Sequence, residues 1–286
     1  LILAEEIFNS VRKEQEVNPG FIFDFAKTLV DTMFVESSEH FFAFYDKKPL
    51  ENYLYTHSLN VSFLSIKIGM WLGLNKSEIM ELAVASFLHD LGMVKVEGIV
   101  KKEGRLGITE RRLVGRHAEY SEQVLRKIGC VNETGLISVR AHHDRDPAKH
   151  RISQIISLAD IYEAITHSRA YKKARTPHQA VGEIIEKETV NFHPDIIRAF
   201  VNNIGIYPVG SWVRLSTGEV GVVVEANKGY PLRPRVNVVF DHLGERAKDT
   251  KKLNFMTESY FYIEGPFDIS DVAEAELKLR EGKNAN

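Results

Sequence analysis

Apolar residues recur at helical spacing along most of the chain. Leu3, Ile7 and Val11 are a first example, because residues three or four apart lie on the same side of an α-helix. Asn18-Pro19-Gly20 interrupts this pattern, and so does the charged, glycine-containing stretch 95–108, which we interpret as a loop. The pattern therefore predicts helices over residues 3–17, 21–45, 53–72, 77–91, 109–128, 132–143, 153–168, 177–187 and 194–204.

Residues that commonly begin helices stand at several of the expected starts. Thr109 is placed to cap the helix over 109–128, because its hydroxyl can accept a hydrogen bond from a free backbone amide. Pro177 and Pro194 fall in the first turn of their helices, where proline is well tolerated.

The pattern changes after Pro208. β-branched runs over residues 212–215, 220–224 and 236–240 are separated by glycine and proline, which is typical of short antiparallel strands. A polar helix is expected at residues 271–280. The fold class is therefore mainly α, a helical bundle with a small C-terminal antiparallel β appendage.

Composition narrows the class of protein. The 286 residues include 37 Lys and Arg against 39 Asp and Glu, and this net charge of -2 does not favour a nucleic-acid coat or a membrane-surface protein. No apolar run is long enough for a membrane span, and no helix-turn-helix or zinc finger is present. The early acidic residues Glu5 and Glu6 are not typical of a secretory signal, and the single cysteine, Cys130, cannot form an internal disulfide. We therefore expect a cytoplasmic protein without nucleic-acid partners.

Histidine is unevenly distributed. Eight of the eleven histidines lie between His57 and His178. The pair His89-Asp90 ends a strongly apolar helix, where an imidazole and a carboxylate are costly to bury unless something pairs with them. Taken alone, the pair would fit a helix-terminal cap with a hydrogen-bonded core histidine.

The pair belongs to a larger set of histidines and aspartates on or near expected helix ends. The adjacent His142 and His143 point about 100° apart on a helix, so both bind metal only if two metals, or two sides of one metal, face them. A carboxylate can bridge two cations, and two close cations polarise a phosphoryl oxygen and lower the pKa of a bridging water. These ligand types suit Fe, Mn or Zn better than Mg, and the chemistry they favour is phosphate-ester hydrolysis. The candidate ligands are His57, His89, Asp90, His117, His142, His143 and Asp160.

Three motifs contain or follow these residues: Tyr55-Thr56-His57-Ser58, His142-His143-Asp144, and Ala159-Asp160-Ile161-Tyr162-Glu163-Ala164 leading to Arg169-Ala170-Tyr171-Lys172. In order and spacing, residues 50–205 resemble the HD-GYP branch of the HD superfamily of metal-dependent phosphohydrolases. The β segment from Tyr207 to Pro234 also resembles a C-terminal extension found on such proteins.

The resemblance implies a phosphodiesterase that hydrolyses cyclic di-GMP to linear pGpG or GMP, with a metal-bridging hydroxide as the attacking group. It makes the seven residues the metal ligands, with Asp90 as the bridging carboxylate and His89-Asp90 as the catalytic pair. It also implies that Arg169 and Lys172 contact the phosphates, a suitable role for a guanidinium and an ammonium group. Tyr171 would either stack on a base or pack against the helix.

The sequence departs from the family pattern at three places. The Gly-Tyr-Pro loop after the histidine doublet is shortened and its tyrosine is absent, and Met93 replaces a lysine three residues after Asp90. Tyr53 stands where members with a third metal carry a glutamate, which favours two metals. Two alternatives therefore remain open: a metal-binding cyclic di-GMP receptor with weak or no activity, and a phosphohydrolase acting on another nucleotide.

The chain is expected to divide into an N-terminal helical segment (1–48), the phosphohydrolase domain (49–206) and the β extension with its helix (207–286). We expect the N-terminal helices to contact protein partners or to support a homodimer. The β extension is expected to pack against the helical domain rather than to bind a partner. Because the chain does not begin with Met, residues upstream are also expected.

Overall fold

A computed structural model describes residues 2–35, 53–100, 102, 104, 106–144, 146, 148, 150–167, 175–247 and 251–268. The chain divides into two compact units: Leu1–Ala174 with Ile184–Ala199, and Arg175–Glu183 with Phe200–Asn286. The helix expected at residues 271–280 lies outside the described residues, and so do Arg169, Tyr171 and Lys172.

The first unit is helical. In order, its elements are α1 (Ile2–Arg12), α2 (Pro19–Val35), α3 (Tyr53–Trp71), α4 (Lys76–Leu88), the 3₁₀ helix η3 (Leu91–Lys95), α5 (Glu97–Val100), α6 (Ile108–Val114), α7 (His117–Ile128), α8 (Glu133–Arg140), α9 (Arg151–Thr166), a π-helical turn (Ile184–Glu188), a 3₁₀ turn (Thr189–Asn191) and the first part of α11 (Pro194–Ile204).

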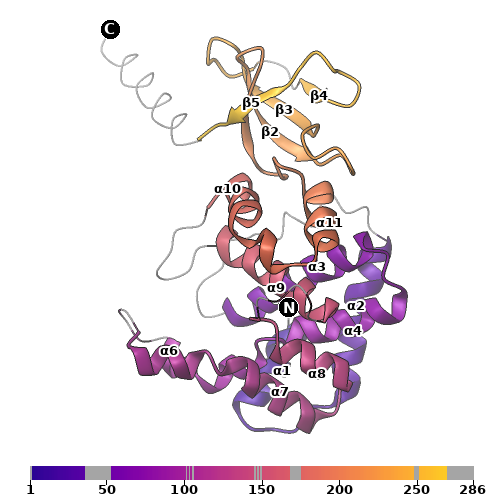
Figure 1. Ribbon diagram of the computed structural model, residues 1–286, viewed down its shortest axis with the longest axis vertical. Coiled ribbons are helices and arrows are strands. Elements are labelled where there is room, and N and C mark those ends of the chain that lie inside the picture. Colours follow the sequence, from indigo (N-terminus) through magenta and orange to yellow (C-terminus); the bar gives the residue numbers. More distant parts are fainter. Residues whose placement is uncertain are drawn as a thin grey trace. The chain divides into compact units, whose positions relative to one another are not determined.

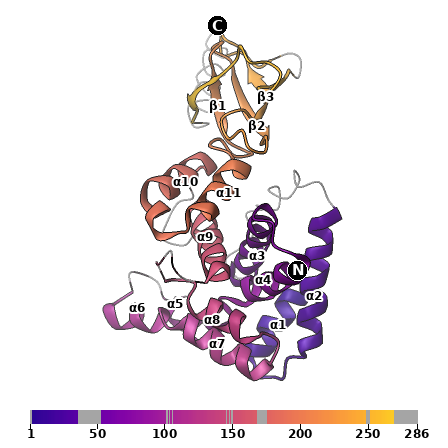
Figure 2. The ribbon, with the colours of Figure 1, turned by 45° about the vertical axis from the view of Figure 1, so that its right-hand side comes forward.

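Helix α4 lies at the centre of this unit, packed against α2, α3, α8 and α9 (Figures 1 and 2). Its apolar residues, including Leu82, Phe87 and Leu88, are buried. Asn75 caps the start of α4 by accepting hydrogen bonds from two backbone amides, while Glu78 accepts one from the Asn75 amide. This capping box fixes where α4 begins, and the helix then carries His89 to the centre of the unit.

Three expectations for local structure were wrong. The interruption between the first two helices falls at residues 13–18, earlier than expected, and Pro19 begins α2, because proline fits the first helical turn and Asn18 accepts a hydrogen bond from the Gly20 amide. The stretch 95–108 contains α5 as well as loop. The helix expected over 109–128 is two helices, α6 and α7, and Thr109 lies inside α6 instead of capping it.

The second unit contains α10 (Pro177–Glu183), the end of α11 and a five-stranded antiparallel sheet. The strands, in the order β4-β3-β2-β1-β5, are β1 (Trp212–Leu215), β2 (Val220–Glu225), β3 (Arg235–Phe240), β4 (Lys252–Asn254) and β5 (Ile263–Pro266). One side of the sheet packs around Val213, Val236 and Phe255. The mainly helical fold with an antiparallel β appendage is thus confirmed, although β4 and β5 were not predicted.

Within the described residues, no helix is both long and apolar enough to cross a membrane.

Candidate metal centre

The seven candidate ligands come from five helical segments of the first unit and lie together. His57 is on α3, and His89-Asp90 directly follows α4. His117 is the first residue of α7, because the break between α6 and α7 falls just before it. His142 and His143 follow α8, and Asp160 is on α9.

Asp90 is at the centre of this cluster. Its Oδ1 lies 3.1 Å from Nε2 of His117 and 3.6 Å from Nε2 of both His89 and His142. Its Oδ2 faces the other way and lies 3.5 Å from Nε2 of His57. The carboxylate therefore has histidines at both of its oxygen atoms.

The remaining two residues complete two groups. Asp160 Oδ1 lies 3.4 Å from Nε2 of His57, and His143 Nε2 lies 2.9 Å from Nε2 of His117. His57, His89 and Asp90 offer ligand atoms within 4.8 Å of one another, and so do His117, His142 and His143. We call these the His57 group and the His117 group.

Three of the imidazoles are oriented by the backbone. Nδ1 of His89 lies 2.7 Å from the Ser86 carbonyl, and His117 and His142 make the same contact with the carbonyls of Val114 (2.7 Å) and Val139 (2.6 Å). A carbonyl can only accept a hydrogen bond, so each Nδ1 carries the proton. In the neutral ring, Nε2 then presents a lone pair toward Asp90.

The pKa shifts of His89 and His142 favour the neutral ring, whereas that of His117 favours the protonated ring beside Asp90. Burial lowers the pKa of His89, and burial with the neighbouring His89 charge lowers that of His142 well below its usual range. Burial alone would raise the pKa of Asp90, but His89, His117 and His57 together hold it well below its usual range. Burial lowers the pKa of His117, but the adjacent Asp90 carboxylate outweighs this, so the net direction is upward.

The centre thus gathers acceptor atoms without matching donors. Nε2 of His89 and Oδ1 of Asp90 are buried without a hydrogen-bond partner among the described residues. Ligands about 2.1 Å from one cation lie about 3.0–3.4 Å from each other, close to the separations observed around Asp90. Both groups could therefore hold a metal ion, which would satisfy atoms that are otherwise costly to bury.

A close approach of backbones brings Asp90 to His117. Gly92 in η3 packs so tightly on α7 that a Cβ atom there would lie 2.2 Å from the His117 carbonyl oxygen and 2.4 Å from the Ser121 nitrogen. The Gly92 amide donates to the Ser121 hydroxyl at 2.8 Å. Only glycine permits this approach.

Sequence reasoning missed one important residue, Glu163. Its Oε2 lies 2.6 Å from Nδ1 of His57, and both side chains are only 2% exposed. A signal was available, since Glu163 follows Asp160 by three residues on α9 and therefore lies on the same helix face.

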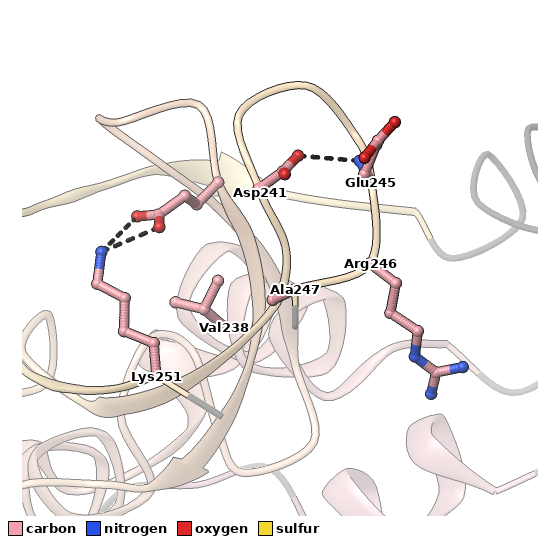
Figure 3. A pocket seen from close by; sticks show the side chains of 7 residues that line it. Val238, Asp241, Glu245, Arg246, Ala247 and Lys251 are labelled. Atoms are coloured by element: carbon pink, nitrogen blue, oxygen red, sulfur yellow. Dashed lines mark hydrogen bonds and ion pairs between the residues drawn. The ribbon is translucent and has the colours of Figure 1, made fainter. Parts of the chain in front are cut away.

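A separate depression of about 420 Å³ lies on the second unit, near the loop after β3 (Figure 3). Its polar groups are largely paired with one another. Lys251 Nζ lies 2.9 Å and 3.1 Å from the two Glu219 carboxylate oxygens, and the Glu245 amide donates to Asp241. With these groups satisfied, the depression does not resemble a catalytic site.

The fold and the histidine–aspartate centre define an HD-domain protein. Residues 54–165 match the HD domain family and contain all seven candidate ligands, while residues 212–275 match the family described as "KOW domain associated with HD domain". The chain thus belongs to the HD superfamily, and its resemblance to HD-GYP proteins is confirmed by the relatives that follow.

The chain is 35% identical over 205 residues to the cyclic di-GMP phosphodiesterase PA4108 of Pseudomonas aeruginosa, covering 68% of this chain and 49% of that protein. It is 23% identical over 199 residues to the cyclic di-GMP phosphodiesterase PdeB of Borreliella burgdorferi, covering 66% and 52%. The chain therefore spans about half the length of these relatives.

Among solved structures, the chain resembles Bd1817, an HDG"Y"P protein from Bdellovibrio bacteriovorus. The TM-score is 0.54 at 15% identity, covering 69% of this chain and 66% of the other. At this identity the likeness concerns the fold, and it agrees with a helical HD domain.

Proposed function

We propose that this protein is a metal-dependent phosphodiesterase that hydrolyses cyclic di-GMP to linear pGpG or GMP. The observation that carries the proposal is the convergence of imidazole Nε2 atoms on the two oxygens of Asp90. Two relatives that share this chain's HD region are named cyclic di-GMP phosphodiesterases, which supports the choice of substrate.

Each group would hold one divalent cation. His57, His89, Asp90 and Asp160 would hold the first, and Asp90, His117, His142 and His143 the second. Two bound cations would supply Lewis acidity toward a phosphodiester and a water molecule. The nitrogen-rich ligands favour Fe, with Mn or Zn as further candidates, over a magnesium ion that prefers oxygen.

The chain's own groups prepare this chemistry. The Ser86, Val114 and Val139 carbonyls hold three imidazoles in the tautomer whose Nε2 faces inward. The lowered pKa of Asp90 keeps its carboxylate ionised at neutral pH, so that both oxygens remain available as ligands. Because these groups are already oriented, little reorganisation is needed when the cations and substrate bind.

The substrate contacts proposed for Arg169, Lys172 and Tyr171 rest on the resemblance to HD-GYP proteins. All three follow α9, the helix that contributes Asp160, closely in sequence. Arg169 and Lys172 would pair with phosphate oxygens, and Tyr171 would contact a base. We also propose that the protein acts in the cytoplasm and that α1 and α2 contact protein partners or a second copy.

The test is a turnover assay with cyclic di-GMP. Protein purified without oxygen would be loaded with ferrous iron or manganese and compared with His89→Ala and with His193→Ala, a control in which an exposed histidine is removed. Linear or mononucleotide product from wild type and His193→Ala, and none from His89→Ala, supports the proposal. Absence of product from wild type with two bound metals would overturn it in favour of a receptor or another nucleotide substrate.

A further inference from the structure

His57 differs from three other imidazoles of the centre in how it is oriented. His89, His117 and His142 lie at helix ends and place Nδ1 on the carbonyl three residues earlier. His57 lies inside α3, where the backbone carbonyls accept the hydrogen bonds of the helix itself. Its Nδ1 lies instead 2.6 Å from the side-chain carboxylate of Glu163.

Glu163 is itself held in place. Its Oε1 lies 3.3 Å from Nδ1 of His167, one turn further along α9, and 3.4 Å from Nδ2 of Asn60, three residues after His57 on α3. The contacts of Glu163 with His57 and Asn60 join α9 to α3, and these two helices pack against each other (Figure 2). Glu163 therefore has few ways to rotate away from His57.

The contact also makes the two groups electrostatically unequal. Two ligand carboxylates, Asp90 and Asp160, adjoin His57, and the Glu163 carboxylate lies behind its ring. The charges of Asp90 and Asp160 also act on the His117 group, at His117 and His143, so the difference between the two groups lies in Glu163, which contacts His57. A cation in the His57 group would meet more negative charge in a buried setting, where charges interact more strongly than in water.

We propose that Glu163 is a positioning residue that fixes the ring and tautomer of His57, and that it thereby makes the His57 group the tighter of the two cation positions. This inference rests on the metal centre of the proposed function. A carboxylate that accepts a ligand histidine's N–H raises the basicity of the ring, and loss of such a partner commonly costs about 10- to 100-fold in metal affinity.

The test is a titration of metal-free protein with Mn²⁺, with unbound Mn²⁺ followed by electron paramagnetic resonance. Wild type is expected to bind in two steps. Glu163→Gln keeps an acceptor near His57 but removes the charge, and should weaken the tighter step by about 10- to 100-fold while leaving the other unchanged.

Two further variants serve as controls. Gln154→Ala removes a buried side chain from the same helix, one that accepts a hydrogen bond from the His193 amide away from the centre, and should leave both steps intact. His143→Ala removes a ligand of the His117 group and should abolish the weaker step alone. Together these variants assign each step to a group.

Four results are decisive. A tighter step unchanged in Glu163→Gln would overturn this inference. Loss of both steps with a lowered melting temperature of the metal-free variant would also overturn it, because Glu163 would then be needed for the fold. Wild type that fails to bind two Mn²⁺ ions would instead overturn the metal centre itself. Wild type that binds two ions and hydrolyses cyclic di-GMP, with Glu163→Gln unaffected, would leave the proposed function standing without this inference.

Discussion

Oδ1 of Asp90 lies 3.1 Å from Nε2 of His117, a contact between the end of α4 and the start of α7. It joins two groups of potential metal ligands through a single carboxylate, whose other oxygen faces His57. Among the described residues, no other carboxylate contacts histidines of both groups. A substitution of Asp90 therefore tests the two-metal centre.

Asp90→Ala should remove both cations, since Asp90 is a proposed ligand of each. We expect the metal content of protein loaded with Mn²⁺ to fall from about two ions per chain to none, as measured by mass spectrometry of the metal. Asp195→Ala, which alters an exposed aspartate on α11, is the control and should keep the full content. Full retention in Asp90→Ala would rule out the bridging role.

Gly92→Ala should destabilise the protein and weaken metal binding together. The added methyl group would meet the His117 carbonyl and α7 backbone, so η3 must move away and take Asp90 with it. Overpacking of this kind costs about 1–3 kcal/mol, which thermal unfolding of the metal-free protein would reveal.

Gly98→Ala is the matched control for this change. Gly98 lies in α5 with no described atom within 4 Å of an added Cβ, so the substitution should be neutral or stabilising by up to about 1 kcal/mol. Equal melting temperatures for Gly92→Ala and wild type would show that the close approach is not required.

Arg169→Ala should weaken cyclic di-GMP binding by roughly 10- to 100-fold, the effect of losing a charge-assisted hydrogen bond of about 1.5–3 kcal/mol. Metal content should not change. Calorimetric titration with the nucleotide measures the affinity, and Arg198→Ala removes an exposed arginine as a control. Unchanged affinity in Arg169→Ala would mean that Arg169 does not contact the nucleotide.

Cys130 should be unreactive in the folded protein. Burial raises the pKa of its thiol from 9.0 to about 11, so almost no thiolate forms at pH 8. Iodoacetamide should label it slowly in native protein and readily in urea. Rapid native labelling at pH 8 would contradict the burial.

The same pKa shift affects stability. Because burial disfavours the thiolate in the native state, the contribution of the protonated Cys130 thiol to the free energy of unfolding should be complete below pH 9 and lost as the pH rises toward about 11.

Much of the centre was predictable because its residues stand out chemically. A buried His89-Asp90 pair at the end of an apolar helix calls for a partner. His117, His142 and His143 likewise stand at or just after helix ends, whereas His57 and Asp160 lie inside α3 and α9. The seven side chains that the sequence grouped do lie together. Their assignment as ligands remains a prediction that metal loading must test.

Other features were not visible in the sequence because they depend on tertiary contacts. Glu163 looks like any helical glutamate until α3 packs on α9 and places it against His57. The break before His117 arises where α6 ends at Val114 and its carbonyl accepts the His117 ring proton, which helix propensity does not encode. Strands β4 and β5 have three and four residues with one β-branched residue between them, Ile263, so the residue types that indicate a strand are scarce there.

The most direct test is a crystal structure of Mn²⁺-loaded protein with data recorded at the manganese absorption edge. The account predicts two anomalous peaks on either side of the Asp90 carboxylate, one beside His57, His89 and Asp160 and one beside His117, His142 and His143. A single peak away from Asp90, or none in protein that hydrolyses cyclic di-GMP, would contradict the two-metal centre.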